Sequence, residues 1–152
     1  MTTATLTTSP PTTGWRDPRA FVKPEVWERQ ILLLTRDHPF DRVMAERVFG
    51  QAVAYLITAM EKWGQRLGIG CGPLVDMGVH QFILDTRNYA DFCAEHFGGQ
   101  FLHHVPEIKF KYDGSVEKTA IVIANNGFEI DRPLWEVDFA KCTPCAPGTE
   151  CH

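Results

Sequence analysis

Residues 41–68, DRVMAERVFGQAVAYLITAMEKWGQRLG, constrain the fold more than any other stretch of the chain. Apolar side chains recur in it at the spacing of an α-helix, and Asp41 stands where an N-cap is expected. Val53, Tyr55 and Ile57 widen the apolar face until it covers much of the cylinder, so we expect this helix at the centre of a bundle. The regularly spaced apolar residues are Val43, Met44, Val48, Phe49, Ala52, Leu56, Ala59, Met60 and Trp63.

Several other segments also have helical patterns. The expected helices are residues 24–37, 73–86, 86–98 and 115–127, with a short helix around 134–137. Pro24 and Pro73 suit a first helical turn, and the residue before Pro39 disfavours the α conformation, which ends the first helix. The β-branched run Ile121–Ile123 leaves a strand as an alternative within 115–127. Residues 107–114 are expected to form a short strand or an extended arm.

The domain organisation follows from length and composition. A chain of 152 residues with 44% hydrophobic and 22% charged residues favours one domain with its own core. Residues 1–14 are rich in Thr, Ser and Pro, and we expect them to form a disordered leader. The fold class is therefore mainly α, a single-domain helical bundle over residues 15–140. An irregular Cys-rich tail is expected at residues 141–152.

Charge and cysteine usage exclude several classes of function. The net charge is −4, so no basic field favours nucleic acid as a partner. No apolar run approaches the ~20 residues of a membrane span, and the N-terminus lacks signal-peptide features, so we expect no membrane partner and a cytoplasmic location. Five cysteines, an odd number, argue against a closed disulfide framework. The sequence identifies neither a particular small-molecule or protein partner nor an oligomeric state.

The stretch FCAEHFGGQFLHHVP, residues 92–106, holds three of the six histidines beside a cysteine. Asp76 and His80, four residues apart, share one face of the helix expected just before it. Cys93 lies late in the next helix, near the same end as Asp76, and the loop with His103 and His104 starts there. One site can therefore be formed by four residues: Asp76, His80, Cys93 and one loop histidine.

Each of these residues also has a structural explanation. Asp76 suits a helix N-terminus through the macrodipole, and His80 could be a hydrogen-bonded core histidine. Cys93 lies between Phe92 and Phe97, and such a cysteine is often a small buried hydrophobe. A nucleophilic triad of Cys93, His104 and Asp76 has the right residue types, but the Phe neighbours argue against a reactive thiol, and no catalytic residue is assigned. His96 is expected to face solvent.

Residues 75–106, VDMGVHQFILDTRNYADFCAEHFGGQFLHHVP, resemble the signature of the glycine-rich-domain-containing-protein-like family. Val79 and Phe82 depart from its pattern, because many members carry Trp and a second His there. The resemblance implies a helical domain and favours His104 over His103 as the partner of His80. The matching positions are Asp76, His80, Tyr89, Cys93, Gly98, His104 and Pro106.

Together these patterns predict a metal site at Asp76, His80, Cys93 and His104. Mixed N, S and O ligands favour zinc, with iron or copper as alternatives. Four protein ligands would make the site structural, whereas an open position would make it catalytic.

The main hypothesis is a small cytosolic metal-binding protein, with a metal-dependent enzyme as its more specific form. The alternative is a non-enzymatic binding or adaptor module whose thiol tail binds metal or a partner, and a third is a thiol redox protein. The tail residues concerned are Cys142, Cys145, Cys151 and His152.

We predict that deleting residues 1–14 leaves the fold intact, because this segment offers Leu6 as its one apolar anchor of size. Thermal unfolding of the shortened chain measures the effect. A melting temperature several degrees below that of the full chain would contradict the assignment of a disordered leader.

Overall fold

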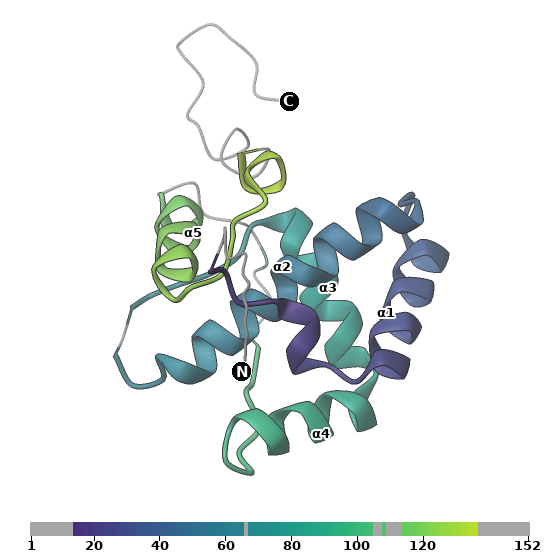
Figure 1. Ribbon diagram of the computed structural model, residues 1–152, viewed down its shortest axis with the longest axis horizontal. Coiled ribbons are helices and arrows are strands. Elements are labelled where there is room, and N and C mark those ends of the chain that lie inside the picture. Colours follow the sequence, from purple (N-terminus) through teal and green to yellow (C-terminus); the bar gives the residue numbers. More distant parts are fainter. Residues whose placement is uncertain (1–13, 66, 105–107, 109–113, 137–152) are drawn as a thin grey trace, which may run out of the picture.

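The computed structural model describes residues 14–65, 67–104, 108 and 114–136. Within these ranges the chain is mainly helical, which confirms the expected fold class (Figure 1). The leader before Gly14 and the tail from residue 141 lie outside the described residues, so both remain predictions. The helices are η2 (Pro18–Phe21, 3-10), α1 (Pro24–Asp37), α2 (Arg42–Glu61), α3 (Pro73–Leu84), α4 (Thr86–His96) and α5 (Ser115–Asn125), followed by a short helix at 132–136.

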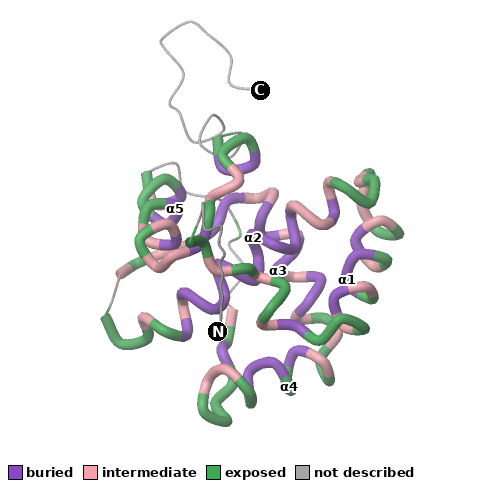
Figure 2. Tube along the Cα trace, viewed as in Figure 1, coloured by how far each residue is buried: buried purple, intermediate pink, exposed green. Residues whose placement is uncertain are grey.

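Helix α2 is the central element, as its all-round apolar pattern predicts. It packs against α1, α3, α5 and η2, and every residue from Val48 to Thr58 is buried (Figure 2). The Asp41 side chain accepts a hydrogen bond from the backbone N–H of Met44 at 2.8 Å, which confirms the expected cap. No helix in the described ranges combines the length and apolarity that a membrane span requires.

Helix α2 is shorter than expected, because it ends at Glu61 and not near residue 68. Gly64 has a φ of 90°, in the left-handed region that glycine adopts without strain, so the chain turns away there. Trp63, assigned to the apolar face, consequently lies beyond the last turn and is 64% exposed. Val43, assigned to the same face, lies in the first turn and is 65% exposed.

The remaining helix boundaries mostly agree with the sequence. His38, the residue before Pro39, has an extended backbone and ends α1. The segment with the β-branched run forms helix α5, so the strand alternative is wrong. Gly114, with a φ of 84°, occupies the cap position of α5, and Ser115 is the first residue of the helix.

Asp85 joins helix α1 to the turn between α3 and α4. Its carboxylate accepts hydrogen bonds from Arg29, Gln30 and Asn88 at 2.8–2.9 Å. Burial alone would raise the pKa of Asp85, but the hydrogen bonds and the Arg29 charge together hold it below its usual value. These contacts fix the start of α4 relative to α1.

Helices α2 and α3 approach each other closely at Gly78. A Cβ atom there would lie 2.9 Å from the Cβ of Ala52 and 3.1 Å from Val48 Cγ1, both buried in α2. Only a residue without a side chain allows this contact. Asp76 and His80 lie two residues before and after Gly78 on the same helix.

We predict that Gly78→Ala lowers the free energy of unfolding by about 1–3 kcal/mol, because the methyl group overpacks the interface. Gly50→Ala is the matched control: it is also mid-helix, and its Cβ would meet only Trp27 at 3.8 Å. Alanine's helix propensity should make that variant neutral or up to about 1 kcal/mol more stable. Chemical denaturation measures both, and equal effects would contradict a tight α2–α3 contact.

Candidate metal centre

Asp76 is the centre of the candidate site. It lies in the first turn of α3, after the Pro73 that begins the helix, and it is 8% exposed. Its two carboxylate oxygens face two imidazoles: Oδ2 lies 2.8 Å from His80 Nδ1, and Oδ1 lies 2.8 Å from His104 Nε2. A buried carboxylate needs such partners to offset the cost of leaving water.

The two histidines come from different elements and meet at this carboxylate. His80 is one turn after Asp76 on α3, and its ring lies 4.9 Å from that of His104, edge to face. The His104 side chain is 15% exposed and that of His80 is 38% exposed, so the pair runs from the interior to the surface. A carboxylate oxygen accepts a hydrogen bond from an imidazole in the tautomer that places the ring proton on the facing nitrogen.

Asp76, His80 and His104 form a group that could hold a metal ion. One potential ligand atom from each lies within 4.8 Å of the others. Two imidazoles and one carboxylate are a donor set that zinc and other transition metals accept.

The loop that carries His104 is anchored by Tyr89 of α4. The Tyr89 hydroxyl donates a 2.6 Å hydrogen bond to the backbone carbonyl of Leu102, which is also buried. Burial, together with the neighbouring Cys93, raises the pKa of Tyr89, so its hydroxyl remains a donor. Gly98 has a φ of 61°, which helps the chain turn back after α4.

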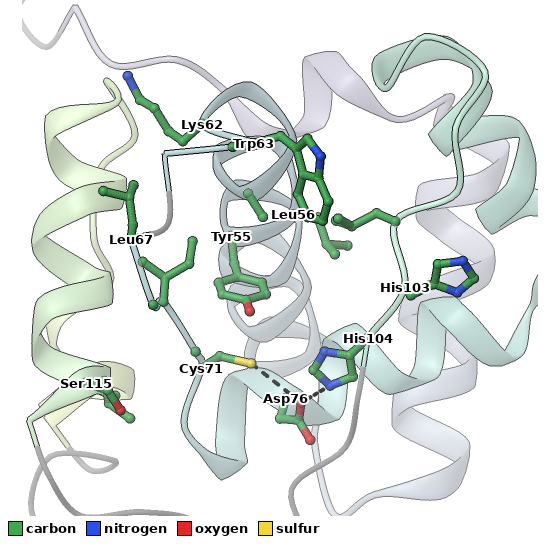
Figure 3. Close-up of a pocket in the computed structure, with 17 residues that line it drawn as sticks. Tyr55, Leu56, Lys62, Trp63, Leu67, Cys71, Asp76, His103, His104 and Ser115 are labelled. Atoms are coloured by element: carbon green, nitrogen blue, oxygen red, sulfur yellow. Dashed lines mark hydrogen bonds and ion pairs between the residues drawn. The ribbon is translucent and has the colours of Figure 1, made fainter.

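The neighbouring loop residues point in different directions. His103 is exposed whereas His104 is half-buried, and Figure 3 shows the two rings pointing apart. His96 does not face solvent as expected: its Nε2 lies 2.8 Å from the carbonyl oxygen of Phe21, and its side chain is 16% exposed. Neither His103 nor His96 belongs to the group around Asp76.

The structure places two cysteines differently from the sequence analysis. Cys93 is buried against the Tyr89 hydroxyl and, among the described residues, does not belong to the group around Asp76. Cys71, which was not among the expected site residues, donates from Sγ to Asp76 Oδ1 at 3.5 Å. Its signal was weak, because it lies in a Gly-rich segment that indicates only a turn.

A cavity of about 560 Å³ opens beside Asp76 and His104 (Figure 3). Tyr55 of α2 lines it, and burial, with smaller contributions from Cys71 and Asp76, raises the pKa of this phenol. His80 does not line this cavity, so the two histidines reach Asp76 from different sides. Such a volume is typical of small-molecule sites.

Comparison with known proteins identifies one family. A family model described as UCP032817-like matches residues 24–122, more than half of the chain. No curated protein and no solved structure matches the chain. The resemblance to the glycine-rich-domain-containing-protein-like family is therefore wrong. It depended on seven positions within 75–106, whereas the family model also spans α1 and α2.

We predict that Tyr89→Phe lowers the free energy of unfolding by about 1–3 kcal/mol, because the buried Leu102 carbonyl loses its donor. Tyr55→Phe is the matched control, since that hydroxyl lines the cavity and does not anchor the loop. Chemical denaturation gives the energies, and the imidazole NMR signals of His104 should shift in Tyr89→Phe. An unchanged stability and spectrum would show that Tyr89 does not hold the loop.

Proposed function

We propose that this chain, which belongs to the UCP032817-like family, is a metal-binding protein whose ion is held by Asp76, His80 and His104 and serves catalysis in the adjoining cavity. The observation that supports this most strongly is the convergence of two imidazoles on one buried carboxylate. Two of these residues share a helix face, but His104 is 28 positions from Asp76, so the fold has to bring it there.

The ligand set favours a catalytic over a structural ion. Catalytic zinc sites commonly have three protein ligands and keep one position for water or substrate. Here three ligands adjoin a cavity large enough for a small molecule. A divalent ion in such a site supplies Lewis-acid activation of water or of a carbonyl or phosphoryl oxygen.

Zinc is the favoured metal, and iron is the strongest alternative. Neutral imidazoles and a carboxylate bind zinc at about 2.0–2.2 Å in tetrahedral geometry. The same two-histidine, one-carboxylate set with open positions is also found in non-haem iron(II) oxygenases. The residues alone fit both ions, so the metal must be identified by analysis of the protein.

Cys71 supports a second candidate function. Its Sγ lies 3.5 Å from Asp76 Oδ1, so a small movement could bring a thiolate to the ion as a fourth ligand. Four protein ligands would leave no open position, and the site would then stabilise the fold of a non-enzymatic binding module.

Metal analysis tests the site. We predict that the wild type takes up one zinc ion per chain. His80→Ala and His104→Ala should each lower the affinity by more than the roughly 10- to 100-fold that loss of an outer-shell partner costs. His103→Ala is the matched control, because this exposed histidine neighbours His104 but lies outside the group. Equal metal content in all four proteins would contradict the proposal.

Cobalt(II) substitution separates the two functions. Direct thiolate ligation produces strong near-ultraviolet charge-transfer absorption, whereas an ion held by nitrogen and oxygen alone lacks this band. The catalytic proposal predicts no such band and an unchanged spectrum in Cys71→Ser. A band that disappears in Cys71→Ser would favour the closed, structural site.

A further inference from the structure

We propose that the cavity beside Asp76 binds a small amphipathic carboxylate, with its apolar chain along α2 and its carboxylate at Lys62. This inference names the ligand class of the proposed site and rests on that function for its biological meaning. The cavity itself exists without the metal, so its ligand can be tested separately.

The walls of the cavity are mainly apolar. Leu56, Ala59 and Trp63 line one side along α2 and just beyond its end, and Ile69 and Val116 line it from the segment before α3 and from α5. Burying an alkyl chain against such a surface gains about 0.8 kcal/mol per methylene group. A strongly polar ligand such as a sugar would leave most of its hydroxyl groups without partners here.

Lys62 supplies the positive charge at the mouth of the cavity. Lys62 lines the cavity, and its ammonium group points away from the other labelled lining residues (Figure 3). The neighbouring Glu61 carboxylate is engaged by Arg16 through two hydrogen bonds of 2.7 and 2.8 Å. The charge of Lys62 contributes to lowering the pKa of Glu61, but within the described part of the chain Lys62 forms no ion pair at contact distance. Its flexible four-carbon stem can therefore direct the ammonium group to a bound anion.

The opposite end of the cavity is polar and lies at the candidate metal centre. Tyr55, Cys71, Asp76 and His104 line this floor (Figure 3). Lys62 follows Tyr55 by seven residues, a rise of about 10 Å along a helix, which suits a chain of roughly eight carbons. If the ligand's carboxylate lies at Lys62, the end of its alkyl chain therefore lies beside the candidate ion.

Octanoate is the probe that tests this proposal, titrated into the 152-residue chain after metal removal with a chelator. Calorimetry should detect binding, and methyl NMR signals of Leu56 and Ile69 should shift while those of Ile31 and Leu34 in the core do not. Octan-1-ol, which has the same chain without the charge, should bind more weakly.

Lys62→Gln should weaken octanoate binding by about three- to tenfold, as expected for a partly exposed charge pair. Lys118→Gln is the matched control, because it removes an exposed lysine of α5 that does not line the cavity. The proposed orientation would be overturned if Lys62→Gln bound octanoate with unchanged affinity. It would also be overturned if octanoate bound only to the metal-loaded protein. No binding to either form would overturn the ligand class and leave the metal proposal standing.

Discussion

The close packing of α3 on α2 at Gly78 is the constraint on which the rest of the structure depends. A side chain at this position would overlap Ala52 and Val48 in the most buried part of α2. Asp76 and His80 flank Gly78 on α3, and Tyr55 and Leu56 of α2 line the cavity beside Asp76. The absence of a side chain at Gly78 lets α3 pack closely on α2, and the buried Asp76 carboxylate of α3 lies at the edge of the apolar cavity.

The buried carboxylate of Asp76 then organises the candidate site. An unpaired charge with 8% exposure would be costly, and the two imidazoles and the Cys71 thiol offset this cost by donating hydrogen bonds. The same lone pairs are available to a metal ion, which would replace the shared protons. Tyr89 contributes from outside the cluster, because it holds the loop that positions His104.

The parts that could be predicted from sequence are those set by local spacing. Helical periodicity predicted the central position of α2, and the four-residue interval predicted that Asp76 and His80 share a face. The parts that could not be predicted depend on contacts between distant segments. Cys93 was expected beside Asp76, but among the described residues it lies outside the group around Asp76, and Cys71 from the segment before α3 contacts the carboxylate instead. The contact of His96 with the Phe21 carbonyl and the cavity at Lys62 likewise arise from tertiary packing.

The measurement that tests the central claim most directly is a crystal structure of zinc-loaded protein with data collected at the zinc absorption edge. The account predicts one strong anomalous peak within about 2.0–2.2 Å of an Asp76 oxygen, His80 Nδ1 and His104 Nε2. A peak held by other residues, or none at saturating zinc, would contradict it. If no peak appeared at saturating zinc, His80 and His104 would have the structural role of pairing the buried Asp76 carboxylate.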